Sequence, residues 1–393
     1  MLDRDIANSL LEASRSYPVV AVTGPRQSGK TTLVRRLFPE RPYVLLEEPD
    51  TRRFATEDPR GFLAQFTDGA ILDEAQRAPD LFSYIQGIVD DDPRPGRFIL
   101  TGSQQFGLMS GITQSLAGRV SMQVLLPFSY HELAPSETQA DSVEMLLYQG
   151  AYPPVHDRQL DPTAWYSNYV TTYVERDVRQ LVTVRDLTTF ETFLRMCAAR
   201  CGQLVNLTGL ANDCGISHNT ARSWLSILEA SYIVGLAAPH FRNFNKRLVK
   251  SPKLYFLDPG LAAWLLEVRT PGQVRSHPMR GPLFETWVYS ELLKGFMNRG
   301  QRPRIYFWRD RSGLEIDFVA DCGTTLIPIE VKSGATFASE WLSPLEKWKG
   351  LAGNDAGQAW LVHGGERSGT RSGVETLAWN GISSVVEFLL KAE

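Results

Sequence analysis

One segment near the start of the chain restricts its fold more than any other feature. Residues 24–31 read GPRQSGKT and match the phosphate-binding P-loop pattern G-x-x-x-x-G-K-[ST]. The segment follows the apolar run 19–22 and opens a helical pattern at Thr31. In such a loop the glycines let successive N–H groups face phosphate oxygens, and the helix N-terminus adds partial positive charge. The segment therefore predicts a nucleotide site between a strand and a helix, with an ordinary glycine turn as the alternative.

The nucleotide expected at this loop is ATP, held together with Mg²⁺. We expect Lys30 to reach the β- and γ-phosphates and the Thr31 hydroxyl to ligate the metal ion. The residues expected to contact the nucleotide are Gly24, Pro25, Arg26, Gln27, Ser28, Gly29, Lys30, Thr31, Thr32 and, from a later strand, Ser103.

Two acids follow a short apolar run in AILDE (70–74). A carboxylate at the end of a buried strand beside a P-loop can hold the Mg²⁺ shell, which is the Walker-B role and here falls to Asp73. Glu74 can then orient and deprotonate the attacking water. Alone the pattern also fits a solvated strand end, but after a P-loop it favours catalysis of ATP hydrolysis.

Two further segments carry polar groups expected at the same site. FILTGS (98–103) is an apolar strand that ends in hydroxyls, and Ser103 or Thr101 fits the γ-phosphate sensor of AAA-type ATPases. A Gly-Ser turn that caps the strand is the alternative. LAGR (116–119) places Arg119 before the last strand of this region. A positioned arginine can stabilise transition-state charge from the same chain or from a neighbouring subunit, and a surface arginine is the alternative.

The pattern of apolar segments predicts an α/β protein with a helical middle. The first region alternates strands at 18–24, 43–47, 70–73, 98–102 and 120–126 with helices such as 29–38 and 81–89. This alternation indicates a parallel sheet covered on both faces. Helices dominate from about 141 to 236, and a helix at 283–296 then precedes strands at 304–308, 315–320 and 326–332.

Composition excludes several classes of protein. A chain of 393 residues is too long for one ordinary hydrophobic core, so two or three domains are expected. Its contents of 43% hydrophobic and 22% charged residues are typical of globular proteins. A net charge of -3 argues against non-specific coating of nucleic acid but is compatible with a local basic surface. We find no signal peptide and no apolar stretch long enough to span a membrane. Four cysteines are too few for a disulfide framework, so the expected location is the cytoplasm.

The sequence as a whole resembles the bacterial and archaeal AAA+ ATPases that join an AAA-14 ATPase domain to a DUF4143 region. The matching segments are GPRQSGKT, AILDEAQ, ILTGSQ and LAGR in the first part, and TYVERDV, KSPKLYFLDPGLAAWL, GPLFETWVYSEL, GLEIDFV and IEVKSG further along. They occur in the same order and cover nearly the full chain. The resemblance implies ATP binding and a C-terminal region with nuclease-like architecture.

Three domains are expected from these patterns. Residues 1–130 form a P-loop, AAA-like ATPase domain, 131–270 a helical linker with a winged helix-turn-helix-like region, and 271–393 a DUF4143 C-terminal domain of PD-(D/E)XK nuclease-like α/β fold. Stretches that contain Pro and Gly, at 133–138 and 270–274, set the boundaries.

Residues 207–229 read as a helix, a tight turn and a second helix. Gly215 permits the turn and Ser217 caps the second helix. Leu210 and Ala211 are expected to face inward. The side chains expected to point outward, where a recognition helix meets bases and phosphates, are those of His218, Asn219 and Arg222.

The stretch 230–257 contains no acid and carries the cations Arg242, Lys246, Arg247, Lys250 and Lys253. Such a segment suits a wing on a DNA backbone, so residues 217–253 are the predicted DNA interface. A packing module inside an AAA protein is the alternative.

The spacing of Cys197, Cys201, Cys214 and His218 fits no standard zinc pattern, which favours buried thiols.

Three acids and a lysine in the last region predict a second site. Asp317 lies on one expected strand, Glu330 and Lys332 lie on the same face of the next, and Glu285 lies on the preceding helix. This is the layout of PD-(D/E)XK nucleases. The carboxylates of Asp317 and Glu330 would hold Mg²⁺ beside a scissile phosphate, and Lys332 would offset charge in the transition state. An ion pair on an exposed strand face is the alternative.

Three functions remain compatible with these patterns. The first is an ATP-dependent enzyme that processes DNA, favoured by the filled acidic set. The second is a nucleotide-driven switch that binds DNA or protein without cleavage. The third is a sensor ATPase whose C-terminal region only mediates assembly. The acidic net charge favours the last two. Besides ATP and DNA, a further copy of the chain in a homo-oligomer is an expected partner.

Overall fold

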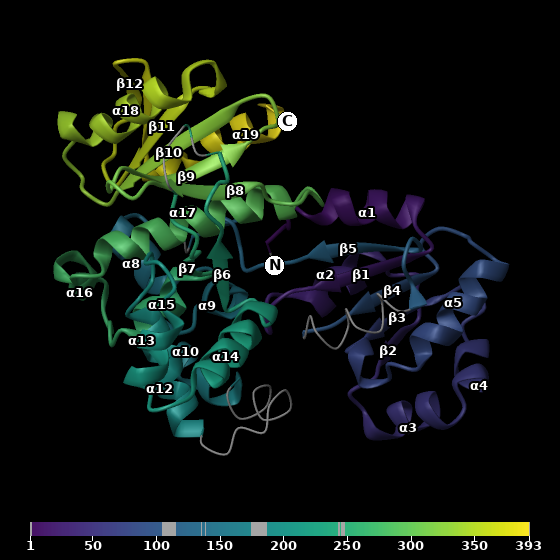
Figure 1. The fold of residues 1–393 in the computed structure, drawn as a ribbon. Coiled ribbons are helices and arrows are strands. Elements are labelled where there is room, and N and C mark those ends of the chain that lie inside the picture. The colour runs from purple at the N-terminus through teal and green to yellow at the C-terminus, as the bar shows by residue number, and fades with distance from the viewer. Residues whose placement is uncertain are drawn as a thin grey trace. The chain divides into compact units, whose positions relative to one another are not determined.

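The computed structural model describes residues 2–103, 115–134, 136–137, 139–173, 187–242, 244 and 248–392. The chain forms two compact units, whose elements are labelled in Figure 1. The first unit contains Met1–Phe128, Ala230–Tyr232 and Phe296–Arg302. The second contains Ser129–Glu229, Ile233–Gly295 and Pro303–Glu393. Among the described residues, no helix combines the length and apolar character needed to cross a membrane.

The first unit is built on a five-stranded parallel sheet with the order β2-β3-β4-β1-β5. The strands are β1 (Val19–Thr23), β2 (Tyr43–Leu45), β3 (Ala70–Asp73), β4 (Phe98–Thr101) and β5 (Val120–Val124). All five predicted strands are confirmed, with ends that shift by up to two residues. The predicted α/β class and the parallel arrangement are confirmed as well.

Helices cover both faces of this sheet because its strand residues alternate in direction. Val20 and Val22 of β1 pack with α1 (Ala7–Ser16) and α2 (Lys30–Leu37). Val19 and Ala21 face the opposite side, where the core is shared with α3 (Pro49–Glu57), α4 (Pro59–Ala64) and α5 (Leu81–Asp91). Strands that are buried on both faces read as continuous apolar runs, which is the pattern of β1, β3 and β4.

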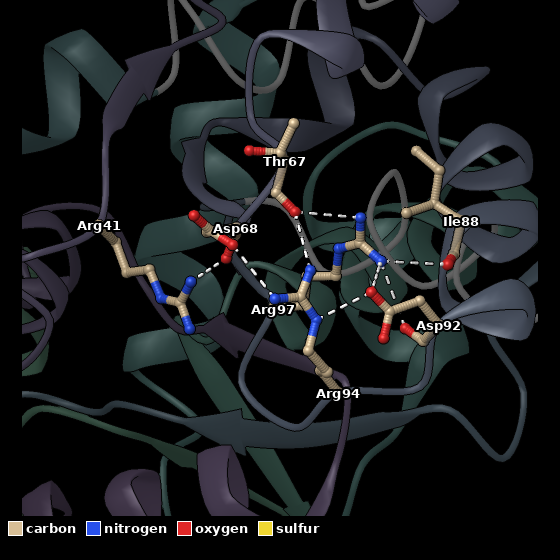
Figure 2. A network of polar contacts seen from close by, with 7 residues as sticks. All are labelled: Arg41, Thr67, Asp68, Ile88, Asp92, Arg94 and Arg97. Carbon is tan, nitrogen blue, oxygen red and sulfur yellow. Dashed lines mark hydrogen bonds and ion pairs between the residues drawn. The ribbon is translucent and has the colours of Figure 1, made fainter.

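An arginine network joins the loops that lead into β3 and β4 (Figure 2). The Arg94 guanidinium contacts Asp68 Oδ1 at 3.1 Å and Asp92 Oδ2 at 2.8 Å. Arg97 also pairs with Asp92, and both arginines donate to the carbonyl of Thr67. These contacts hold the two loops together at the amino ends of the strands, away from the P-loop.

Gly69, in the middle of that network, tolerates no side chain. Its φ is +95°, and an added Cβ would lie 1.6 Å from the carbonyl oxygen of Arg97. We therefore expect Gly69→Ala to lower the unfolding free energy of the first unit by more than about 2 kcal/mol. Far-UV circular dichroism during urea unfolding would measure the change. The matched control is Gly87→Ala in α5, where the new methyl meets no atom within 4 Å, so little change or a small gain is expected.

Two short segments from the later part of the chain belong to the first unit. In the segment Ala230–Tyr232, the buried Tyr232 places its hydroxyl 2.7 Å from that of Thr23, the last residue of β1. In the segment Phe296–Arg302, an added Cβ on Gly300 would lie 2.6 Å from Ser9 Oγ. The first unit is therefore not a continuous stretch of sequence.

The second unit begins with helices, and its predicted helix-turn-helix is confirmed. The helices are α7 (Tyr130–Leu133), α8 (Val143–Gln149), α9 (Pro153–Asp157), α10 (Pro162–Tyr173), α12 (Leu187–Ala198), α13 (Leu207–Asp213), α14 (His218–Ala230, whose last residue joins the first unit), α15 (Pro259–Leu265) and α16 (Pro271–Ser276). Ser217 Oγ accepts from the backbone N–H of Thr220 at 3.1 Å, which caps α14 as predicted. The antiparallel pair β6 (Val234–Ala237) and β7 (Lys253–Phe256) follows.

A six-stranded mixed sheet with the order β12-β13-β11-β10-β9-β8 completes the second unit. Its strands are β8 (Ile305–Arg309), β9 (Glu315–Asp321), β10 (Leu326–Lys332), β11 (Ala359–His363), β12 (Gly369–Arg371) and β13 (Val374–Ala378). Helix α18 (Ser343–Ala352) shares a core with β9, β10 and β11. Trp360 of β11 packs instead on Phe388 of α19 (Ile382–Ala392), and Phe318 of β9 stacks on Tyr289 of α17 (Arg280–Met297). The predicted helix and three strands of this region are confirmed.

Asp258 is a buried carboxylate that ties α15 to the loop after α8. It accepts from Leu261 N at 2.8 Å, from Ala151 N at 2.7 Å and from the Tyr166 hydroxyl at 2.6 Å. Removing it would leave the buried N–H groups of Ala151 and Leu261 without this acceptor, whereas the Tyr166 hydroxyl would keep the Gln149 carbonyl at 3.0 Å. We expect Asp258→Ala to lower the unfolding free energy by about 3–5 kcal/mol. All nine tryptophans of the chain lie in the second unit, so tryptophan fluorescence during urea unfolding reports this loss.

The cost of Asp258→Ala is expected to depend on pH. Burial raises the pKa of Asp258 above its ordinary value, against the opposing effect of its three hydrogen bonds. The folded state therefore holds the Asp258 proton more tightly than the unfolded state. The resulting contribution of Asp258 to the unfolding free energy is complete below the unfolded pKa of about 3.9. It is lost as pH rises through the folded pKa. The substitution should therefore cost more near pH 4, close to the unfolded pKa, than at pH 8, and an equal cost at the two pH values would contradict this.

Candidate functional site

The P-loop leaves the carboxyl end of β1 in a conformation that requires glycine. Gly24 has a φ of +144°, and an added Cβ would lie 2.1 Å from the carbonyl oxygen of Leu125. Gly29, at the N-terminus of α2, has a φ of +94°. Both are conformations that other residues rarely adopt. The two glycines therefore shape a loop whose N–H groups can turn toward a bound anion.

Two polar side chains of the P-loop, those of Lys30 and Ser28, indicate which kind of ligand the loop binds. The buried Lys30 Nζ donates to the carbonyl oxygens of Gly24 at 3.0 Å and Pro25 at 2.7 Å. Ser28 is fully buried, and its hydroxyl has no hydrogen-bond partner among the described residues. A buried hydroxyl without a partner is costly unless a ligand supplies one. The loop therefore fits the phosphates of a nucleotide.

Asp73 accepts from donors on strands β2 and β4, on α2 and on the residue that follows it in the chain. Its Oδ2 accepts from the hydroxyls of Thr31 and Tyr43, both at 2.7 Å. Its Oδ1 accepts from the Thr101 hydroxyl and, at 3.1 Å, from Glu74 N. The predicted Mg²⁺ residues Thr31 and Asp73 are thus in direct contact, and hydroxyl and carboxylate oxygens are ligands that Mg²⁺ accepts. These residues fit the metal ion expected with ATP.

Tyr43 was missed by the sequence analysis. It starts β2, and β2 pairs with β3 so that Leu45 lies opposite Asp73. Burial and the hydrogen bond to Asp73 raise the pKa of the Tyr43 hydroxyl above its ordinary value, so it stays protonated and acts as a donor. Only a correct guess of the strand order could have placed this tyrosine beside the acid.

Glu74 adopts a left-handed conformation (φ 56°) directly after β3. Its Oε2 accepts from Ser103 Oγ at 3.1 Å and from Gln76 Nε2. The two hydroxyls considered as γ-phosphate sensors therefore serve different acids: Thr101 contacts Asp73, and Ser103 contacts Glu74. Gln76 is an additional residue of this cluster that the sequence analysis did not select.

The position of Arg119 corrects one expectation. Strands β1 and β5 are parallel, and the Arg119 carbonyl accepts from Val19 N at the amino end of β1. The P-loop leaves the other end of this five-residue strand, about 15 Å away. The Arg119 guanidinium pairs instead with Asp90. A contact with the nucleotide of its own chain is therefore excluded, and a role toward a neighbouring subunit stays a prediction.

The second unit brings the four predicted acidic-site residues into one cluster. Lys332 Nζ donates to Glu330 Oε1 at 2.6 Å, as expected for residues two apart on one face of β10. Asp317 Oδ2 on β9 accepts from Val331 N at 2.9 Å and lies 3.9 Å from Lys332 Nζ. Glu285 on α17 completes the cluster, since its charge affects the pKa of both Glu330 and Lys332.

A second lysine inside this cluster was assigned incorrectly from the sequence. Lys253, expected on a DNA backbone, is only 3% exposed and lies 2.9 Å from Glu285 Oε1, 2.5 Å from Glu315 Oε1 and 3.8 Å from Asp317 Oδ1. Its position on β7 turns the side chain toward the carboxylates, so it cannot reach a phosphate backbone outside. Tyr255, two residues later on β7, also donates to Glu285. Neither contact has a local sequence signal.

The carboxylates open onto a cavity of about 680 Å³, called here the acidic cavity. Asp310, Glu315, Asp317 and Glu330 line it together with Lys347 in the middle of α18. Glu330 is buried, and its Oε2 has no hydrogen-bond partner among the described residues. Burial and the neighbouring Asp317 raise the pKa of Glu330 to about 8 and that of Glu285 to about 7.

This donor set meets part of what the expected metal ion requires. The described residues contain no group of three or more His, Cys, Asp or Glu side chains placed to hold one. Mg²⁺, however, is commonly bound by one or two carboxylates, with water and substrate oxygens completing its shell. Asp317 and the orphaned Glu330 oxygen meet that smaller requirement. The assignment to the PD-(D/E)XK fold itself stays a prediction.

The predicted DNA interface divides into accessible and inaccessible parts. His218, Asn219 and Arg222 of α14 are exposed, as is Lys250. Arg242 pairs with Asp355 at 2.8 Å. Lys246, Arg247 and most of the segment TYVERDV lie outside the described residues.

Cys197 and Cys201 are buried, and burial raises the pKa of the Cys201 thiol to about 11.

Replacing Lys253 tests whether a cation is required in the acidic cluster. Because Lys253→Met leaves three carboxylates facing one another in a buried place, we expect it to lower the unfolding free energy by about 3–5 kcal/mol. Adding Mn²⁺ should restore part of this loss, because a divalent cation can replace the lost charge. Tryptophan fluorescence during urea unfolding measures both effects. The control is Lys250→Met at an exposed position, and an equally small change in both variants would contradict the prediction.

Three family models match consecutive parts of the chain. The model AAA_14, an AAA domain, matches residues 16–134. A domain of unknown function, DUF8612, matches residues 140–272, and a second, DUF4143, matches residues 280–380. The uncharacterized protein Rv2008c of Mycobacterium tuberculosis is 32% identical over 338 residues, which cover 85% of this chain and 74% of that protein. Mb2031c of Mycobacterium bovis matches to the same extent.

Solved structures also match parts of the chain at low identity. The Walker-type ATPase PABY2304 of Pyrococcus abyssi has a TM-score of 0.46 and 17% identity, covering 68% of this chain and 96% of that one. AMPPCP-bound DnaA from Aquifex aeolicus has a TM-score of 0.28 and 15% identity, covering 57% and 86%.

Proposed function

We propose that this chain, which belongs to the family of AAA-type ATPases joining an AAA_14 domain to a DUF4143 domain, couples ATP hydrolysis in its first unit to action on nucleic acid in its second. The AAA domain accounts for ATP binding and for the ATPase class. The action on nucleic acid rests on one observation: Glu285, Asp317, Glu330 and Lys332, distant in sequence, converge beside the acidic cavity.

In the first unit, each residue has a proposed task. Residues 24–31 hold the phosphates through backbone N–H groups, and Lys30 exchanges its loop carbonyls for phosphate oxygens. Thr31 and Asp73 would hold Mg²⁺, which would neutralise charge at the phosphates when bound. Glu74, oriented by Ser103, accepts a proton from the attacking water.

In the second unit, Asp317 and Glu330 would hold a divalent cation. The cavity wall carries four carboxylates and few cations, so a phosphodiester would be repelled until their charge is offset. Lys332, held by Glu330, is placed to stabilise negative charge that develops on the phosphate. The exposed side chains of His218, Asn219 and Arg222 would contribute binding to DNA through α14.

A binding function without cleavage is the second candidate, and Lys253 favours it. This lysine already pairs with Glu285 and Glu315 and lies near Asp317, so the cluster has a resident cation. A site of that kind can be stable without metal. The chain would then use ATP to switch its affinity for nucleic acid or for a protein.

One experiment separates the two candidates. ATP hydrolysis by the purified full chain is measured with and without single- and double-stranded DNA and RNA, and the same nucleic acids are then examined on a gel after incubation with Mg²⁺ or Mn²⁺. Metal-dependent cleavage is expected if the second site is a nuclease. Intact nucleic acid under both metals, with and without ATP, would contradict cleavage and leave the switch. If nucleic acid is neither bound nor able to change ATP hydrolysis, both candidates fail.

A further inference from the structure

A second cavity in the same unit, of about 780 Å³, lies beside the carboxyl ends of strands β10, β11 and β13. These neighbouring strands are parallel. The cavity is lined by Ala335 after β10, by Gly364 and Gly365 after β11 and by Trp379 after β13. In open α/β sheets, ligands bind at this edge of parallel strands. We call this cavity the arginine pocket.

The floor of the arginine pocket is formed by two loops in close backbone contact. An added Cβ on Gly364 would lie 2.4 Å from the carbonyl oxygen of Ser333, and one on Gly365 would lie 2.4 Å from that of Ala335. Side chains at these positions would separate the loops. The pocket is therefore a packed feature of the fold, and not a gap between loose segments.

Four arginines line the pocket: Arg275, Arg280, Arg367 and Arg371. Arg280, at the start of α17, donates to the Ser333 carbonyl and lies 3.2 Å from Glu144 Oε1, while its Nε has no hydrogen-bond partner among the described residues. Arg367 and Arg371 are exposed, and neither forms an ion pair with a carboxylate in the part of the chain that the structure describes. These two exposed guanidinium groups are therefore available to a ligand, in a lining that also contains the acids Asp141 and Glu366.

Arg371 also offers a flat surface. Its guanidinium lies over the ring of Phe337, 4.3 Å from the ring centre, and Phe337 lines the same pocket. A guanidinium held on an aromatic ring keeps its plane fixed and exposes its other face. Unpaired bases stack on such planes, whereas the bases of a duplex are already stacked on each other.

We propose that the arginine pocket binds the backbone of single-stranded nucleic acid, with phosphates on Arg367 and Arg371 and a base against Arg371. The proposal rests on the proposed function for its substrate class. Ser333, which Arg280 contacts, directly follows Lys332 of the acidic cluster. A bound strand would therefore lie next to the proposed cleavage site.

The test measures binding separately from cleavage. Fluorescence anisotropy of a labelled single-stranded DNA oligonucleotide is followed at increasing salt, in EDTA, with the full chain and with the double variant Arg367→Gln and Arg371→Gln. Each lost phosphate contact should reduce the log–log salt slope by about 0.7, so the variant should bind at least about tenfold more weakly at low salt. The matched control replaces the exposed Arg158 and Lys391 with Gln, which changes the charge equally outside the pocket.

The outcomes distinguish this proposal from the proposed function. Weaker binding in the double variant alone supports the pocket, even when no cleavage follows on addition of Mn²⁺. Cleavage by wild type together with unchanged binding in the variant overturns the pocket and leaves the nuclease standing. An equal loss of binding in the control variant also overturns the assignment of binding to the arginine pocket. Duplex DNA bound as tightly as the single strand, or complete displacement by millimolar inorganic phosphate, overturns the single-strand assignment. Unchanged tryptophan fluorescence and basal ATP hydrolysis verify that the variants fold.

Discussion

Glu74→Gln is expected to bind ATP as the wild type does while hydrolysing it roughly a hundred to ten thousand times more slowly. Glutamine has nearly the same shape and can still accept from Ser103, so the structure of the cluster should persist. The amide cannot take a proton from water. Nucleotide binding is measured with a fluorescent ATP analogue and hydrolysis by phosphate release. Wild-type turnover in this variant would exclude Glu74 as the base.

Two controls place that effect at the site. Lys30→Ala should lose ATP binding or hydrolysis, because the neutral side chain can no longer reach the phosphates through the P-loop. Glu57→Gln makes the same charge change as Glu74→Gln at an exposed position of α3 and should leave both measurements unchanged. A loss of turnover in Glu57→Gln would point to a general effect of charge.

Asp317→Ala is expected to abolish metal-dependent cleavage of nucleic acid, and Lys332→Ala should do the same. Asp317 and Glu330 are hard oxygen ligands that suit Mg²⁺ or Mn²⁺, and without a cation they repel the phosphate. ATP hydrolysis should largely survive, because Asp73 and Glu74 lie in the other unit. The gel assay with each metal measures cleavage, and phosphate release measures hydrolysis.

Controls for Asp317 separate chemistry from folding. Asp317→Asn keeps an acceptor for Val331 N and should lose cleavage while its tryptophan fluorescence stays unchanged. Glu285→Ala should weaken cleavage less, provided that Glu285 only supports the cluster. Glu387→Ala on the exposed face of α19 should change nothing. Full cleavage by Asp317→Asn would rule out this residue as a metal ligand.

The sequence alone determined those features that depend on neighbours along the chain. Strands buried on both faces appear as apolar runs, so β1, β3 and β4 were located almost to the residue. The P-loop follows from its glycines, because the required positive φ angles are a local property. The alternation of a strand likewise places Glu330 and Lys332 in contact. The N-cap of α14 follows from the serine at position 217, and its outward residues follow from the period of a helix.

Only the tertiary structure decided which of these elements meet. Arg119 lies far from the nucleotide loop because β5 runs parallel to β1 and residue 119 precedes it, a relation that no local pattern contains. Tyr43 reaches Asp73 because β2 was placed beside β3. The sequence indicated that Lys253 is one more surface cation. In the structure, β7 directs its side chain toward a group of carboxylates that lie 32 to 64 residues later in the chain. Periodicity reports how deeply a residue is buried, whereas its partner is set by the packing of segments distant in sequence.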